Sequence, residues 1–388
     1  MEEAFIPLSV PNFSGREKEY VNEAVVSEWV STGGSRVPAF EAAIADYVGM
    51  PQAVACNSGT AGLHLAMLAA GVQPGDAVLA PTLTFIAAVN PIRYCGAEPI
   101  FIGCDDSLCM DPAALRRFCE TECRLQGKEL YHIASGRRIR AVCVVHVFGN
   151  MADMEAILPL AQQYGLLVVE DATEALGTRY EAGPYAGRYA GTLGDVGVYS
   201  FNGNKIMTTG SGGMLVSRHD DWAQHARHLS TQAKAAPDSY VHDEVGYNYR
   251  LTNLQAALGL AQLEQLEGFI AHKKELYDFY VSQLQGHCGL RLLGFRPGTR
   301  PNRWFYSLDV GGSRLKKEEL MRLLAARHIQ TRSIWNLIHE QAPYRGCTAY
   351  AVENAVRWQQ RIVNLPCSTS LTVPQAQHVA EAILQAAQ

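Results

Sequence analysis

The chain lacks any apolar run of about 18 residues or more, so the sequence predicts no membrane-spanning helix. It also lacks an excess of positive charge. The formal net charge of −5 provides neither the basic surface of a nucleic-acid-binding domain nor a polybasic segment for an anionic membrane. The N-terminus, MEEAFIPLSV, contains no apolar core of a secretion signal. These absences predict a soluble, cytoplasmic protein that binds neither nucleic acid nor membrane.

The ten cysteines form no C-x-x-C pair, which removes a common signature of zinc and redox sites. Cys119 and Cys123 are four residues apart and would share one face of a helix, with His132 further along the chain. A metal site there is the alternative interpretation. We favour reduced, partly buried thiols in a cytosolic protein, and we expect no metal ion.

The length of 388 residues predicts two domains, because a single core rarely grows to that size. Between residues 53 and 169, short apolar runs alternate with helix-like stretches. Strands and helices in alternation predict a mostly parallel sheet covered by helices on both faces. The capping-box spacing in Ser14-Gly-Arg-Glu17 predicts that a helix starts near residue 18.

The pattern changes in the second half of the chain. Residues 232–248 are polar and predict a long loop, and residues 251–271 predict one long helix. Further helical stretches and a strand near residues 303–310 indicate α+β structure. We therefore divide the chain into an N-terminal arm with a large domain, residues 1–265, and a small C-terminal α+β domain, residues 266–388.

The first candidate for chemistry is the turn NSGTAG, residues 57–62, which follows an apolar strand and opens a helix. The backbone N–H groups of Gly59, Thr60 and Ala61 at a helix N-terminus would bind an anion such as a phosphate. A tight turn with Ser58 or Thr60 as helix cap explains the same residues equally well. The turn is not a P-loop, because no Gly-Lys-Ser/Thr follows it.

Two acids, Glu170 and Asp171, stand at the end of the apolar strand LLVV. Ligands of open parallel sheets bind beyond such strand ends, and a buried acid is costly unless it is paired. A metal ion, a cationic group of a ligand or the first turn of a helix would each satisfy Asp171.

Lys205 lies in SFNGNKIMTTGSGGML, among glycine and small polar residues that follow a strand ending at Ser200. Lysine attacks carbonyl carbons when its surroundings favour the neutral amine. A solvated loop lysine is the alternative. A phosphate anchor, an acid for a pyridine nitrogen and a Schiff-base lysine, in that chain order, indicate pyridoxal 5'-phosphate (PLP). Phe85, which lies between the anchor motifs, is a candidate for covering the ring.

Over nearly its whole length the sequence resembles the DegT/StrS family of PLP-dependent nucleotide-sugar aminotransferases. The resemblance is carried by WVSTGGSRVPAFEAAIADYVG, NSGTAGLHLAMLAAGVQPGDAVLAPTLTFIAAVNPI, VVHVFGN, VVEDATEALG, GDVGVYSFNGNKIMTTGSGGML, GYNYRLTNLQAALG and NLPCSTSLT. It implies an aspartate-aminotransferase-like fold of type I, with a mostly parallel seven-stranded sheet between helices in the large domain. It also implies PLP as cofactor, with pyridoxamine phosphate as the intermediate.

The same resemblance implies roles for individual residues. Lys205 would form the Schiff base and Asp171 would pair with the ring nitrogen, while Gly59, Thr60 and Ser200 would hold the phosphate. The remaining cofactor contacts are expected from Ala61, Phe85, Ala172, Glu174, Asn202 and Asn248.

Three of these contacts have a specific expectation. Phe85 and Ala172 would lie on the two faces of the ring. Glu174 stands near the ring hydroxyl, where relatives have Gln or His. Asn248, in GYNYRL, resembles an asparagine that reaches the phosphate of the neighbouring subunit, which implies a homodimer with shared active sites. The candidate substrate-binding residues are Thr32, Gly33, Arg332 and His339.

Within the family, VVHVFGN, EDATEALGT and the segment 120–140 look most like enzymes of the legionaminic acid and bacillosamine pathways. This resemblance implies transfer of an amino group from L-glutamate to C4 of UDP-2-acetamido-2,6-dideoxy-4-ketohexose, for cell-surface amino sugars. GDP- and dTDP-linked keto sugars are the alternatives. The rival functions are a sugar dehydratase, which has histidine in place of the lysine, a non-catalytic PLP-binding regulator, and a phosphate-ester binder with a metal on Asp171.

Overall fold

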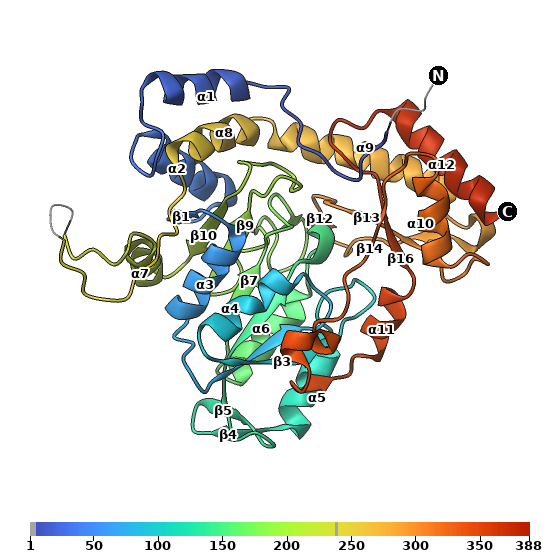
Figure 1. The fold of residues 1–388 in the computed structure, drawn as a ribbon. Helices are drawn as coiled ribbons and strands as arrows, with labels where there is room; N and C mark the ends of the chain where they lie inside the picture. Colours follow the sequence, from blue (N-terminus) through green and yellow to red (C-terminus); the bar gives the residue numbers. More distant parts are fainter. Residues whose placement is uncertain (1–4, 237–239) are drawn as a thin grey trace.

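The centre of the computed structural model, which describes residues 5–236 and 240–388, is a ten-stranded sheet (Figure 1). Seven of its strands follow the order β1-β10-β9-β7-β6-β2-β3, and only β10 runs antiparallel to its neighbours. The predicted mostly parallel seven-stranded sheet is therefore confirmed. Their bounds are β1 Ala53–Cys56, β2 Ala77–Pro81, β3 Glu98–Ile102, β6 Arg138–Val145, β7 Leu167–Asp171, β9 Val196–Ser200 and β10 Gly213–Ser217.

Helices follow most of these strands and pack on the sheet. The strands β2, β9 and β10 are buried along their whole length, as expected for near-continuous apolar runs. Helix α3 packs against β9 and β10, and α6 packs against β7. The helices of this part are α1 Glu17–Val26, α2 Arg36–Val48, α3 Gly59–Ala69, α4 Asn90–Tyr94, α5 Pro112–Thr121, α6 Met154–Gln163, α7 Asp220–Ser230 and α8 Asn253–Leu263.

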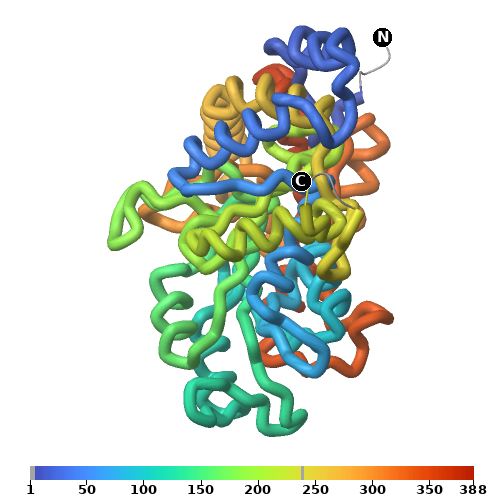
Figure 2. The backbone as a smooth tube through the Cα atoms, turned by 90° about the vertical axis from the view of Figure 1, so that its left-hand side faces the viewer, coloured from blue at the N-terminus to red at the C-terminus, as the bar shows by residue number. Residues whose placement is uncertain are grey.

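Two additions extend the large sheet. The hairpin of β4 (Cys123–Gln126) and β5 (Glu129–His132) pairs with β6 and occupies the segment 120–140. It projects from the end of the molecule opposite α1, as both views show (Figures 1 and 2). The second addition, β15 (Ala349–Tyr350), comes from the C-terminal part of the chain and pairs with β3.

A second, four-stranded antiparallel sheet forms the core of the C-terminal part. Its order is β11-β13-β16-β14. The N-terminal arm joins this part, since Ile6 pairs with Ile329 and Cys367 N–H donates to Leu8 O at 2.8 Å. The domain boundary between residues 265 and 266 stays a prediction. The elements are α9 Leu266–Leu284, β11 Arg291–Leu292, β13 Tyr306–Asp309, α10 Lys317–Ala325, β14 Arg332–Ser333, α11 Glu353–Gln359, β16 Ile362–Leu365 and α12 Val373–Ala387, with β8 Arg179–Tyr180 and β12 Thr299–Arg300 as a separate pair.

One helix prediction was wrong, and the helix predicted to start near residue 18 is present as α1, without its predicted capping box. The single helix over 251–271 is divided into α8 and α9 near Gln265, whose side chain bonds to Glu17 of α1. The capping box does not form, because Ser14 Oγ donates to Gln265 Oε1 at 2.9 Å and Glu17 accepts from Gly15 N–H. Of the predicted loop 232–248, residues 237–239 lie outside the described residues. In the described parts of the chain, no helix has the length and apolar character needed to cross a membrane.

Candidate active site

Three strands that carry the candidate motifs end at the same edge of the sheet. β7 and β9 are parallel, and β1 has the same direction because β10 separates it from β9 with two antiparallel pairings. A cavity of about 450 Å³ lies at this edge. The predicted residues that line it are Gly59, Thr60, Phe85, Asp171, Glu174, Ser200, Asn202, Lys205 and Arg332.

One end of the cavity is built for an anion. The Ser58 side chain caps α3 by accepting a hydrogen bond from Ala61 N–H at 3.1 Å, so the amide of Ala61 is already engaged. The amides of Gly59 and Thr60 remain at the open helix end, where an anion is stabilised. A side chain at Gly59 would come within 2.9 Å of Ser200 Cβ, so glycine permits the close approach of the helix to β9.

The two adjacent acids at the end of β7 have different partners. Glu170 is fully buried and accepts hydrogen bonds from the backbone of Gly191, Leu193 and Gly194. It also pairs with His146 Nε2 at 2.8 Å. Since His146 Nδ1 accepts from Ala152 N–H, the ring proton lies on Nε2 and is donated to Glu170. Glu170 is therefore structural.

The Asp171 side chain faces the cavity. Its Oδ1 atom accepts a hydrogen bond from Thr173 N–H at 3.0 Å. Burial raises the pKa of Asp171, while Thr173 and the positive charge of Lys205 oppose the rise. A buried carboxylate in this position is stabilised by a cationic ligand group, such as a protonated pyridine nitrogen.

Lys205 enters the cavity beside a second buried acid. Its Nζ atom lies 3.6 Å from Glu174 Oε1 and 4.0 Å from the ring centroid of Trp304. Glu174 Oε2 accepts from Phe148 N–H at 2.8 Å. Burial raises the pKa of Glu174 to about 7, although Lys205 acts to lower it. Glu174 can therefore accept or release a proton near neutral pH.

An aromatic wall, which the sequence did not identify, completes the cavity. It consists of Phe148, Trp304, Phe305 and Trp335. Trp304 stacks on Phe305 with centroids 4.0 Å apart, and Phe148 packs on Trp335 at 4.5 Å. Phe85 is 54% exposed, so its ring remains free to cover a flat ligand. The sequence holds no local signal for this wall, because Phe148, Trp304 and Trp335 are far apart along the chain.

Several predicted residues do not line this cavity. Ala172 is fully buried and its N–H bonds to Val198 O. Asn248 is exposed, with its backbone oxygen accepting from Asn57 Nδ2. Thr32 and Gly33 are exposed in the segment between α1 and α2.

His339 is also absent from the cavity lining. Its Nδ1 atom is 2.5 Å from Thr82 Oγ1, and burial lowers its pKa. His339 thus has a polar partner within the protein and lies outside this cavity. Arg332 is therefore the one predicted substrate residue that reaches the cavity.

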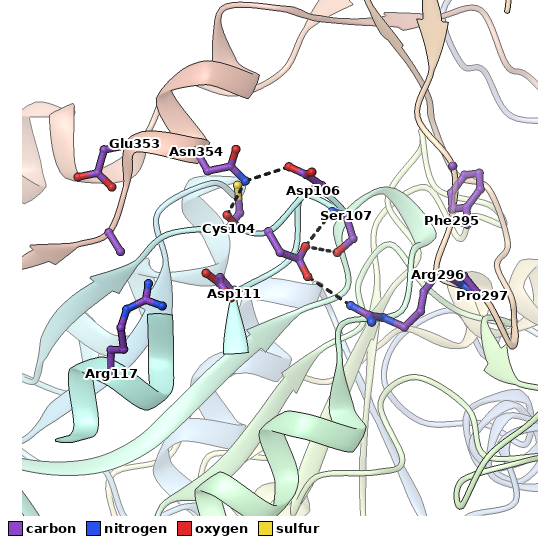
Figure 3. A pocket seen from close by; sticks show the side chains of 13 residues that line it. Cys104, Asp106, Ser107, Asp111, Arg117, Phe295, Arg296, Pro297, Glu353 and Asn354 are labelled. Carbon is purple, nitrogen blue, oxygen red and sulfur yellow. Dashed lines mark hydrogen bonds and ion pairs between the residues drawn. The ribbon is translucent and has the colours of Figure 1, made fainter. Parts of the chain in front are cut away.

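A larger cavity, of about 780 Å³, lies between residues 104–117 and the segments 294–297 and 351–354 (Figure 3). Two of its acids have partners within the protein: Arg296 bonds to Asp105, and Asn354 bonds to Asp106. None of the described residues that line it is a lysine. The smaller cavity therefore fits the predicted chemistry better.

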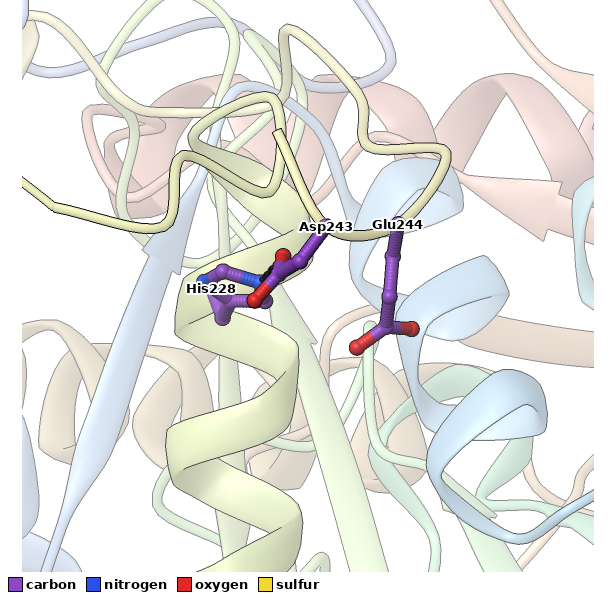
Figure 4. Close-up of side chains that lie close together, drawn as sticks. All are labelled: His228, Asp243 and Glu244. Atoms are coloured by element: carbon purple, nitrogen blue, oxygen red, sulfur yellow. Dashed lines mark hydrogen bonds and ion pairs between the residues drawn. The ribbon is translucent and has the colours of Figure 1, made fainter. Parts of the chain in front are cut away.

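Among the described residues, one group has metal-ligand geometry: His228, Asp243 and Glu244 (Figure 4). It lies on the surface, and His228 Nε2 is bonded to Asp243 Oδ1 at 2.6 Å. Glu244 pairs with His225, so the group ties the segment after residue 239 to α7. Neither Asp171 nor the Cys119–Cys123–His132 set forms such a group within the described chain.

The residues at the cavity fit PLP. The helix end and the Ser200 hydroxyl suit its phosphate, Asp171 has an oxygen left for the ring nitrogen, and Lys205 is close enough to share the cavity. No other described lysine lines this cavity.

Comparison with known proteins supports this assignment. A model of the DegT/DnrJ/EryC1/StrS aminotransferase family matches residues 11–384. The chain is 36% identical to a GDP-perosamine synthase of Escherichia coli O157:H7, over 98% of both chains. It is also 36% identical to EpsN of Bacillus subtilis, which is classed with PLP-dependent aminotransferases, over 98% of this chain and 95% of the relative. The crystal structure of the aminotransferase TlmJ from Streptoalloteichus hindustanus superposes with a TM-score of 0.86, at 28% identity and 99% coverage of each chain.

Proposed function

Because the chain belongs to the DegT/DnrJ/EryC1/StrS aminotransferase family, we propose that it transfers an amino group from L-glutamate to C4 of a nucleotide-linked 4-keto-6-deoxy sugar. It is a PLP-dependent sugar aminotransferase. The observation that carries the proposal is the single cavity that unites the α3 N-terminus, Asp171 and Lys205.

The residues of the cavity have distinct tasks in this reaction. Gly59, Thr60 and Ser200 bind the phosphate, and Asp171 holds the proton on the ring nitrogen. When bound, PLP supplies an electron sink that stabilises negative charge on the carbon that loses its proton. Lys205 Nζ, when not bonded to the cofactor, is the base that takes this proton.

The same cavity serves both the amino donor and the sugar, so the reaction is expected to follow ping-pong kinetics. The aromatic wall and Phe85 exclude water and present flat faces to the substrate. Arg332 lies in β14 at the cavity and can bind a diphosphate through its guanidinium fork.

For the sugar nucleotide, we propose a GDP-linked keto sugar first and UDP-2-acetamido-2,6-dideoxy-4-ketohexose second. The 36% identical GDP-perosamine synthase supports the GDP-linked substrate. The segments VVHVFGN and EDATEALGT support the UDP-linked one. The legionaminic acid and bacillosamine subgroup therefore stays a prediction.

We also propose a homodimer in which Asn248 completes the neighbour's site. Asn248 is exposed and does not line the cavity of its own chain. In a symmetric dimer, an exposed residue of one copy can supply the missing polar contact to the other.

An amino-transfer assay with GDP-, UDP- and dTDP-linked 4-keto sugars, read by mass spectrometry of the product, tests the substrate. We expect the largest kcat/KM with the GDP sugar. A clear preference for the UDP sugar would replace the first candidate by the second, and no transfer to any of the three would overturn the proposed function. Lys205→Arg, which keeps the positive charge, is the matched inactive control.

A further inference from the structure

Trp304 makes two contacts with the segment that carries the reactive lysine. Its ring lies 4.0 Å from Lys205 Nζ, within the range of a cation–π interaction. Its indole Nε1–H donates to Asn204 O at 2.6 Å, and Asn204 directly precedes the lysine. Trp304 is 4% exposed and is held by its stack with Phe305. It therefore fixes both the backbone and the amine of Lys205.

Glu174 approaches the same amine with a carboxylate. The separation between Glu174 Oε1 and Lys205 Nζ is 3.6 Å. Glu174 is itself fixed, because Phe148 N–H donates to its Oε2 atom and Asn302 Nδ2 donates to its backbone oxygen at 2.9 Å. Only 13% of the Lys205 side chain is exposed, so both contacts act with little competition from water.

We propose that Trp304 and Glu174 form a docking place for the Lys205 amine in its protonated form, after it has taken the proton and before it gives the proton back. A ring face and a carboxylate both stabilise an ammonium group and give little to a neutral amine. Once it has taken the proton, the lysine thus rests at a fixed position between the Trp304 ring and the Glu174 carboxylate. Trp304 is a positioning residue in this role, since it acts through Lys205.

Trp304 is set apart from the other cavity aromatics by this contact. Phe85, Phe148 and Trp335 line the same cavity, yet no cation contact joins any of them to Lys205 in the described chain. Trp335 packs on Phe148 instead. The pair Trp304 and Trp335 therefore offers a matched comparison of one residue type in one cavity.

The inference rests on the proposed role of Lys205, and its test uses the full-length chain stripped of cofactor. Acetic anhydride acylates only neutral amines, and peptide mass spectrometry reports the acylation rate of each lysine at a fixed pH of about 8. The exposed Lys274 serves as the internal reference. Loss of the docking place releases the Lys205 amine from both contacts and increases its acylation.

We expect Lys205 in Trp304→Leu to be acylated about threefold to thirtyfold faster than in the wild type, the range of a cation–π interaction that is partly desolvated. Trp304→Phe keeps a ring face and should stay within about twofold. Glu174→Gln should increase the rate, and Trp335→Leu should leave it unchanged. If Trp304→Leu does not fold, Trp304→Met is used in its place, because methionine fills more of the space and has no ring face.

An unchanged Lys205 rate in the Trp304 variants without a ring overturns the inference, as does an equal increase in Trp335→Leu. Such a result leaves the proposed function intact if the wild type still transfers an amino group to a keto sugar. If no sugar is aminated but the Trp304 effect is found, the docking place stands and the proposed function fails.

Discussion

At the scale of single residues, the structure separates acids that look alike in the sequence. Glu170 and Asp171 are neighbours at a buried strand end, but only Glu170 is satisfied by the protein. The family resemblance singled out Asp171 in the sequence, but the residues alone do not reveal the hydrogen bonds that hold Glu170 inside the protein. Strand alternation, together with the turn at residues 191–194, decides that Asp171 meets the ligand.

Glu174→Gln is predicted to flatten the pH dependence of stability. The pKa of Glu174 is raised by burial from 4.5 to about 7, so the folded chain holds a proton that the unfolded chain has lost. The free energy of unfolding therefore falls as pH rises from about 4.5 to about 7, by up to about 3 kcal/mol. Thermal unfolding of the cofactor-free chain at pH 5 and 8 measures this difference.

Between pH 5 and pH 8, the melting temperature of Glu174→Gln should fall by less than that of the wild type. This variant is the matched control because it keeps the size and the hydrogen-bond acceptor. Equal losses in both proteins would show that Glu174 is already charged at pH 5.

At the scale of elements, local patterns predicted the large sheet and its motifs. Apolar runs indicated its strands, and the lysine and acid segments fell at strand ends because parallel strands share an edge. The long helix was predicted wrongly, since the break near Gln265 depends on a contact with Glu17, which is distant in sequence. The true capping boxes, at Thr252 and Thr372, were not recognised.

The aromatic side of the site was missed for the same reason as the break in the long helix, because it depends on contacts between residues that are distant in sequence. Trp304 and Phe305 immediately precede β13, and Trp335 follows β14, in the C-terminal part of the chain. They line one cavity with Lys205 only when that part packs on the large sheet. No periodicity within a short window records such a packing.

Substitution of Gly62 by alanine is predicted to weaken the packing of α3 on the sheet. The added Cβ would lie 2.7 Å from Val198 Cγ1, which forces a shift in a close-packed region. A cost of about 1–3 kcal/mol is expected. Gly268→Ala in α9 is the control, because nothing lies near its added methyl group and alanine favours a helix by about 0.5–1 kcal/mol.

Melting temperatures of the two variants, measured side by side, test this packing. Gly62→Ala should melt below the wild type and Gly268→Ala at or above it. A Gly62→Ala protein as stable as the Gly268→Ala protein would contradict the close approach of α3 and β9.

At the scale of the whole molecule, the active site is formed by distant parts of the chain. The large sheet supplies the anion end, Asp171 and Lys205, and the C-terminal part supplies Arg332 and most of the aromatic wall, Trp304, Phe305 and Trp335. The N-terminal arm lies against the same region, where Ser9 Oγ donates to Asn204 O. A second copy would add Asn248.

Mixed dimers test the proposed sharing of the site. Asn248→Ala and Lys205→Ala are each expected to be inactive. A hybrid dimer of the two has one site with both defects and one site with none, so an equal mixture that exchanges subunits should recover about a quarter of the wild-type activity. No recovery despite exchange, verified by native mass spectrometry, would place Asn248 outside the neighbour's site.

The most direct test of the central claim is the identity of the lysine that bonds the cofactor. The protein is reduced with borohydride in the presence of PLP, which makes the Schiff base permanent, and the modified peptide is identified by mass spectrometry. We predict a phosphopyridoxyl group on Lys205. Modification of another lysine, such as the buried Lys273, or of none, would contradict the account.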